Sequence, residues 1–226
     1  MNHLTSRLST KKLWLLIAAV LIVAAGLMLV TLTKWSVWHD EGYSIMLSQY
    51  SVKELLRRTA LDVHPPLYYL LLKSWAHLFG WSIISVRLMS VLFGLLAIAV
   101  AMLVCHSLFG KKPTLYLAPM LAVASVITRY AQEARMYTFA MVLCLVFVYA
   151  YIRLKQSSSL RKWGVVFVVS AVLLMYTHYF ASLVLLVPII GELWDAYSAK
   201  QGRIVLLGRV KRLAPLYAAI FVLFLP

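Results

Sequence analysis

The sequence predicts an all-α integral membrane protein with about six complete transmembrane helices, a partial seventh, and two interfacial helices in a long first outer loop. Hydrophobic residues make up 63% of the 226 positions, and the mean hydropathy is +0.88. Several apolar runs reach the roughly 20 residues that a helix needs to cross about 30 Å of hydrocarbon. Basic residues gather between alternate runs, as is typical of cytoplasmic loops. We therefore expect a single transmembrane module over residues 1–226.

The apolar runs give the predicted helices in order. The first, residues 13–33, carries no charge and exceeds the apolar core of a secretory signal, so we expect a retained anchor. The other predicted spans are residues 83–105, two within 113–152, two short ones within 163–194, and an incomplete one from Leu213. Because this last run is too short to cross before Pro226, we expect the native protein to continue further.

The charges predict the orientation of these spans. Most of the 22 Lys and Arg residues lie in the N-terminal tail and after the second, fourth and sixth runs, which places those segments in the cytoplasm. The first long loop, 34–82, and the turns at 129–135 and 176–179 then lie outside. Five acidic residues fall on this outer side: Asp40, Glu41, Glu54, Asp62 and Glu133. Any chemistry should face the outer side of what we expect to be a bacterial plasma (inner) membrane.

The strongly basic composition does not indicate nucleic-acid binding. A formal charge of +15 and a pI near 10.0 are typical of such proteins, but membrane orientation and contact with anionic lipid explain both here. Membrane lipid is therefore an expected partner and nucleic acid is not. Cys105 and Cys144 lie in separate apolar runs and indicate neither a disulfide framework nor a zinc site.

The first outer loop has the signals of two helices. Ser51 and Glu54 have the spacing of a capping box, which begins a short amphipathic helix. Pro65 and Pro66 suit the first turn of a second helix. Both helices should lie along the membrane surface and bring residues 62–64 back toward Asp40 and Glu41.

Three motifs in this order resemble a known family. They are His39-Asp40-Glu41-Gly42, His64-Pro65-Pro66-Leu67-Tyr68-Tyr69 and Val86-Arg87-Leu88. The chain resembles the protein O-mannosyltransferase and aminoarabinose transferase relatives of the GT-C superfamily, and residues 129–137 and 176–179 resemble the later outer loops of that family. The resemblance implies an enzyme that transfers a sugar from a polyprenyl-phosphate carrier to a glycan, lipid or protein acceptor on the outer side. It also implies further spans beyond this segment.

The acidic pair is the predicted catalytic centre. An acceptor hydroxyl must lose its proton as it attacks the anomeric carbon, and a carboxylate within hydrogen-bond reach serves as general base. The resemblance places the base at Asp40 and gives Glu41 the role of orienting it or holding the acceptor. The alternative is a pair of solvated loop acids.

A phosphate leaving group needs positive charge. Arg129, Arg135 and His64 are the candidates for binding the donor phosphate. Arg129 lies four residues before Glu133, so an ordinary salt bridge is the alternative for that residue. For Arg87 we favour a side chain that extends to the lipid headgroups.

A divalent metal, Mg, Mn or Zn, is a possible cofactor, although the spacing forms no compact ligand motif. Its candidate ligands are His39, His64, Asp62 and Glu133. Substrate-lining candidates are Asp62, Tyr68, Glu133, Tyr137 and His178, and for the tyrosines an interfacial aromatic belt is the alternative.

A non-catalytic carrier or assembly scaffold is the competing function. A transporter places ionisable groups near the midplane of its spans. Here the spans are nearly free of charge and the acids lie in outer loops, which favours surface chemistry.

Overall fold

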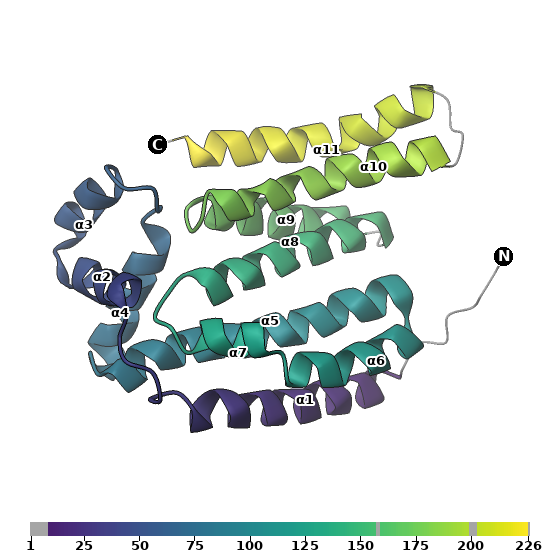
Figure 1. The fold of residues 1–226 in the computed structure, drawn as a ribbon. Helices are drawn as coiled ribbons and strands as arrows, with labels where there is room; N and C mark the ends of the chain where they lie inside the picture. Colours follow the sequence, from purple (N-terminus) through teal and green to yellow (C-terminus); the bar gives the residue numbers. More distant parts are fainter. Residues whose placement is uncertain (1–8, 157–158, 199–202, 226) are drawn as a thin grey trace.

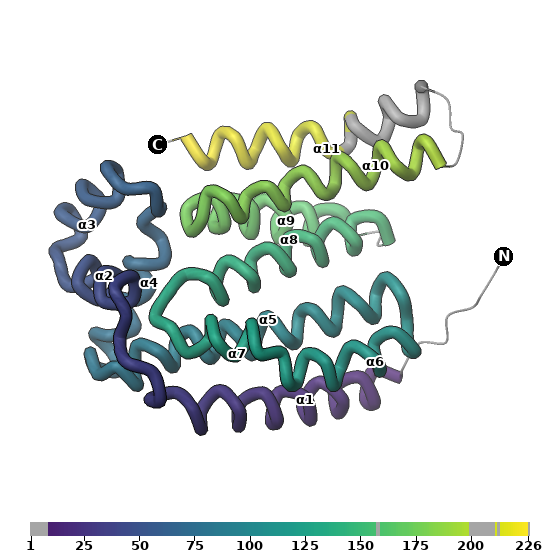
Figure 2. The backbone as a smooth tube through the Cα atoms, in the orientation of Figure 1, coloured from purple at the N-terminus to yellow at the C-terminus, as the bar shows by residue number. Residues whose placement is uncertain are grey.

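The computed structural model describes residues 9–156, 159–198 and 203–225, and within these ranges all regular structure is helical. The bundle consists of α1 (Thr10–Val30), α5 (Ile83–Phe109), α6 (Lys111–Ala122), α7 (Ser125–Ala131), α8 (Tyr137–Gln156), α9 (Leu160–Met175), η1 (Phe180–Leu185), α10 (Leu186–Ser198) and α11 (Arg203–Phe224). They lie side by side, and Figures 1 and 2 show the chain passing back and forth between the two ends of this bundle. The predicted all-α fold is confirmed.

Four helices are long and apolar enough to cross a membrane, among the residues that the structure describes. They are Thr10–Val30, Ile83–Phe109, Tyr137–Gln156 and Phe180–Ser198. The pair α6 and α7, bent by 51°, gives a fifth if it forms one broken span. With 16 residues, α9 is shorter than the roughly 20 that a straight crossing takes. The predicted count of six complete spans and a partial seventh stays a prediction.

Three short helices gather at one end of the bundle (Figure 1) and form what we call the cap: α2 (His39–Gln49), α3 (Val52–Thr59) and α4 (Leu67–Phe79). The sequence predicted α3 and α4 but not α2. Asp40 and Glu41 are therefore first-turn residues of a helix, where the positive end of the helix dipole favours acids. Neither residue lies in a loop, and Glu41 is fully buried, whereas the Asp40 side chain is partly exposed.

Local signals determine where the other two cap helices begin. Ser51 Oγ accepts a hydrogen bond of 3.3 Å from the Glu54 amide, as the capping box predicts. The Glu54 carboxylate does not complete the box, because it binds Arg57 and Arg58 at 2.7 to 2.8 Å. Helix α4 begins directly after Pro66. Its buried face packs Tyr69 and other apolar residues into a core shared with α5 and α8.

The cap is held to the bundle by a buried guanidinium. Arg87 of α5 is only 2% exposed, and its Nε and Nη2 atoms each donate a 2.7 Å hydrogen bond to one oxygen of Glu41. Nη1 donates to the carbonyl oxygens of Leu32 at 2.7 Å and Trp35 at 3.0 Å. Glu41 Oε1 also accepts from the amide of Ala134 at 3.0 Å. We call these contacts the Arg87 clamp; they join α5, α2, the segment after α1 and the turn before α8.

The clamp overturns the prediction that Arg87 extends to lipid headgroups. A lone arginine in an apolar run would do so. Here a carboxylate and backbone carbonyls bind the guanidinium inside the protein, which offsets the large desolvation cost of the charge.

The segment before α8 also approaches the bundle closely. Gly94 of α5 faces Ala131 at the end of α7, and a Cβ at position 94 would lie 3.0 Å from the Ala131 side chain. Gln132 donates to the carbonyl oxygen of Met28 in α1 at 2.8 Å and also contacts Thr31. These contacts set the depth at which residues 132–136 lie beneath the cap.

Arg87→Met is expected to destabilise the protein strongly, because it leaves the Glu41 carboxylate buried without its cation. Breaking one side of a buried pair costs about 3–5 kcal/mol. The measurement is the thermal unfolding midpoint of the purified protein in detergent. Arg57→Met, which removes an exposed cation of the cap, is the matched control and should change the midpoint little. The double variant Arg87→Met/Glu41→Met should recover much of the loss, and equal midpoints for Arg87→Met and Arg57→Met would contradict a structural role for the clamp.

Candidate functional site

The centre of the candidate site is a carboxylate beside a buried cation. Asp40 lies in the first turn of α2 with its side chain 40% exposed, and its Oδ2 is 3.7 Å from Nη2 of Arg135. Arg135 Nη1 donates to Ser44 Oγ at 3.1 Å and to the Asp40 carbonyl oxygen at 3.3 Å. The Nε of Arg135 is buried and has no hydrogen-bond partner among the described residues. The positive charge of Arg135 therefore lies directly beside the accessible Asp40 carboxylate.

A second group of side chains reaches the centre from the segment between α3 and α4. Asp62 Oδ2 accepts a hydrogen bond of 3.0 Å from the Tyr43 hydroxyl, and Asp62 Oδ1 lies 3.8 Å from Nδ1 of His64. The His64 ring faces that of His178, with the centroids 6.2 Å apart. The Leu67 amide donates to the Tyr176 carbonyl oxygen at 3.0 Å, which ties α4 to the turn after α9.

Both histidines are neutral near pH 7. Burial lowers the pKa of His64, and the nearby Arg135 guanidinium lowers it further, against the opposing effect of Asp62 and Asp40. Burial also lowers the pKa of His178, with added repulsion from His64 and Arg135. His178 Nδ1 accepts a hydrogen bond of 3.2 Å from the Ala181 amide. The ring proton of neutral His178 therefore lies on Nε2, where it can be donated to a ligand.

Tyr137 and Tyr68 differ in their access to the site. The Tyr137 ring lies 5.6 Å from the Arg135 guanidinium carbon and 6.3 Å from the His178 ring. Tyr68 is fully buried in α4, where burial raises the pKa of its hydroxyl. Tyr137 thus lines the site, whereas Tyr68 supports it from the core.

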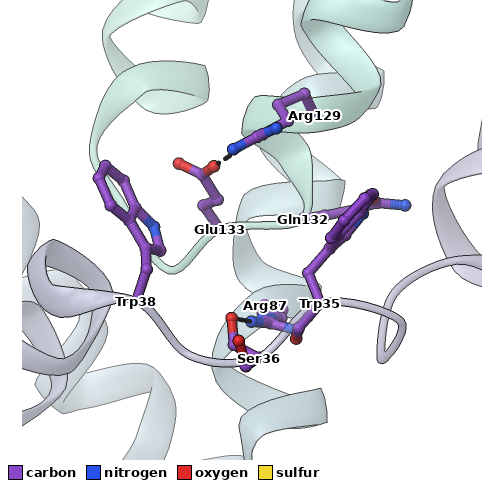
Figure 3. Close-up of a pocket in the computed structure, with 7 residues that line it drawn as sticks. All are labelled: Trp35, Ser36, Trp38, Arg87, Arg129, Gln132 and Glu133. Atoms are coloured by element: carbon purple, nitrogen blue, oxygen red, sulfur yellow. Dashed lines mark hydrogen bonds and ion pairs between the residues drawn. The ribbon is translucent and has the colours of Figure 1, made fainter.

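Arg129 does not lie with Arg135 beside Asp40. Its Nε donates to Glu133 Oε1 at 3.2 Å, so the salt bridge considered from the sequence is present. Arg129 is 67% exposed and lines two adjoining cavities together with Glu133 and Trp38. Figure 3 shows the smaller cavity.

The candidate metal ligands do not converge. His39 is 91% exposed and its Nδ1 lies 3.4 Å from Asp40, which is not one of these candidates, while Glu133 faces Arg129. No three His, Cys, Asp or Glu side chains of the described part of the chain gather in a way that could hold a metal ion. A divalent metal at these positions stays a prediction.

The sequence did not indicate Tyr43 and Ser44 as site residues. Ser44 lies four residues after Asp40, so helical spacing places both on one face of α2, a signal that needed α2 to be recognised. No local pattern pairs Tyr43 with Asp62, 19 positions away. The match between Glu41 and the Ala134 amide, 93 positions apart, is also purely tertiary.

The sequence matches the family model described as dolichyl-phosphate-mannose-protein mannosyltransferase over residues 63–226. The matched part contains His64, Arg87, Arg129, Arg135 and His178, whereas Asp40, Glu41 and Asp62 precede it. No individual curated protein matches the chain. The matched residues cover well over half of the sequence, and the apolar helices described above agree with a membrane glycosyltransferase. The chain is thus an integral membrane protein that belongs to the dolichyl-phosphate-mannose-protein mannosyltransferase family.

Proposed function

We propose that the protein transfers a sugar from a polyprenyl-phosphate-linked donor to an acceptor hydroxyl, with Asp40 as general base. The observation that supports this most directly is the accessible Asp40 carboxylate 3.7 Å from the buried Arg135 guanidinium. A glycosyl transfer that releases a phosphate needs both groups close together. The base takes a proton from the incoming oxygen, and the cation binds the departing anion.

In the proposed step, the acceptor oxygen attacks the anomeric carbon of the donor sugar. The bond between that carbon and the phosphate oxygen breaks, and its electron pair stays on the phosphate. The acceptor proton passes to an oxygen of Asp40. Arg135 stabilises the negative charge on the phosphate, and neutral His64 and His178 can each donate one ring N–H to it.

Glu41 supports Asp40 from the neighbouring position. Both of its oxygens accept from Arg87, and one also accepts from the Ala134 amide. It therefore cannot hold an acceptor without giving up the clamp. We assign Glu41 as a positioning residue, which deepens the predicted role of orienting the base.

The proposed orientation places the cap outside the membrane and the N-terminus in the cytoplasm. The opposite end of the bundle carries Lys11 and Lys12 of α1, Lys111 and Lys112 of α6, and Lys155 of α8. This accumulation supports a cytoplasmic position for that end. In this arrangement α1, α5, α6 with α7, α8, α9 and η1 with α10 make six crossings, α11 begins a seventh, and α3 and α4 lie at the outer interface.

Asp40→Asn is expected to reduce sugar transfer about 100-fold or more, because an amide cannot accept the acceptor proton. The measurement uses membranes that contain the protein and labelled polyprenyl-phosphate sugars. Glu54→Gln, which changes a partly exposed carboxylate of the same cap that binds Arg57 and Arg58, is the matched control and should transfer normally. Equal transfer by Asp40→Asn and the parent protein would show that Asp40 is not the general base. Stable capture of a partner protein without any transfer would support the scaffold alternative.

The stability of the protein should fall as the pH drops below about 6.5, the ordinary pKa of histidine. Because burial lowers the pKa of His64 in the folded state, the unfolded chain binds the proton more readily and gains stability at acidic pH. Thermal unfolding midpoints at pH 7.5 and 5.5 measure the effect. His64→Gln should lose part of this pH dependence, whereas His77→Gln, at an exposed position of α4, should keep it. An unchanged dependence in His64→Gln would show that His64 does not titrate as a buried group.

A further inference from the structure

An aromatic pocket lies beside the Asp40 centre and plays no part in the mechanism above. It has a volume of about 190 Å³ and is lined by Trp35, Ser36, Trp38, Arg87, Arg129, Gln132 and Glu133. Figure 3 shows the Trp35 and Trp38 side chains on opposite sides, with the Arg129 and Glu133 pair between them. Both tryptophans are about half exposed, so their rings are accessible to a ligand.

Glu133 contributes to this pocket a carboxylate oxygen that accepts no hydrogen bond from the described residues. The residue is only 7% exposed, and its Oε1 accepts from Arg129 Nε at 3.2 Å. Its Oε2 is buried and has no hydrogen-bond donor among the described residues. In Figure 3 this second oxygen points away from Arg129, on the side of the Trp38 ring. A buried carboxylate oxygen without a donor is costly, and a ligand hydroxyl would satisfy it.

The charges of the pocket favour a neutral ligand. Each cation is paired with one anion, since Arg129 binds Glu133 and Arg87 binds Glu41. A phosphate in the pocket would meet the Glu133 carboxylate, and an ammonium group would meet the exposed Arg129 guanidinium. A hydroxyl avoids both repulsions, because it can donate to Glu133 Oε2 and accept from a terminal nitrogen of Arg129.

The two tryptophans add shape selectivity for a ring. The C–H faces of a pyranose are apolar and stack on an aromatic ring, while its hydroxyls project sideways toward polar groups. An indole provides a large rigid face for this contact at small entropic cost. Two tryptophans on opposite sides of a carboxylate and a guanidinium therefore match a sugar ring better than a lipid tail or an extended peptide.

We propose that this pocket binds an uncharged pyranose ring of the acceptor, so that the acceptor class is a glycan. A second cavity of about 470 Å³ shares Trp38, Arg129 and Glu133 and extends to Tyr137, which lies against Arg135. A glycan held between the tryptophans can thus extend along this cavity toward the transfer centre. The assignment to the acceptor rests on the proposed function, whereas sugar binding by the pocket does not.

The binding test uses methyl α-D-mannopyranoside and the full chain in detergent micelles, with saturation-transfer NMR titrations. We expect the parent protein to bind the glycoside, and Trp38→Ala and Glu133→Gln each to weaken binding about tenfold, the loss of one good contact. Trp14→Ala, which removes a comparably exposed tryptophan of α1, is the matched control and should bind normally. Thermal midpoints equal to the parent value identify folded variants, and Glu133→Gln provides the test if Trp38→Ala does not fold.

Three results would overturn the proposal: no binding by the parent protein, parent-like binding by both pocket variants, or tighter binding of mannose 1-phosphate that depends on Trp38. The variant Asp40→Asn distinguishes a failure of this proposal from a failure of the proposed transfer mechanism. It should bind the glycoside normally while losing transfer. If Asp40→Asn binds the glycoside normally and still transfers sugar, the sugar site is supported and only the role of Asp40 as general base is rejected.

Discussion

The buried ion pair between Arg87 and Glu41 is the interaction on which the site depends. A guanidinium 2% exposed is stable only if its charge and donors are satisfied inside the protein. Its partners lie within residues 32–41, 46 to 55 positions from Arg87 in the sequence, so this stretch is fixed relative to α5. Glu41 in turn accepts from the Ala134 amide, which fixes the turn before α8 as well. Asp40 is the neighbour of Glu41, and Arg135 is the neighbour of Ala134, whose amide binds Glu41. One cation therefore sets the spacing of the two groups proposed to carry the reaction.

The three arginines near the site differ in how completely they are paired. The nitrogens of Arg87 are committed to Glu41 and to carbonyl oxygens, which suits a structural role. Arg135 is equally buried but keeps an Nε without a hydrogen-bond partner among the described residues. Arg129 is mostly exposed and pairs through its Nε with Glu133. Among the three, only Arg135 places a buried positive charge beside the accessible Asp40 carboxylate, which is the position expected of a group that stabilises a leaving anion.

The sequence predicted those features that depend on neighbouring residues. The apolar runs, the cap of α3 at Ser51 and the start of α4 after Pro66 follow from local chemistry. Helix α2 was missed because its 11 residues include few apolar side chains with clear periodicity. The partner of Arg87 lies 46 positions away, so no local pattern distinguishes a clamp from a side chain that reaches the headgroups. Asp40, Asp62, His64, Arg135 and His178 were nevertheless predicted to lie on one side, because charge placement alone orients loops.

The turn between α7 and α8 joins the pocket, the clamp and the transfer centre within a few residues. Glu133 faces the pocket, Ala134 binds Glu41, and Arg135 lies beside Asp40. The depth of this turn depends on Gly94, which lets Ala131 approach α5 closely. Any displacement of the turn would move all three groups together, because consecutive residues share one short backbone segment. The pocket, the clamp and the transfer centre are therefore built on the same three consecutive residues.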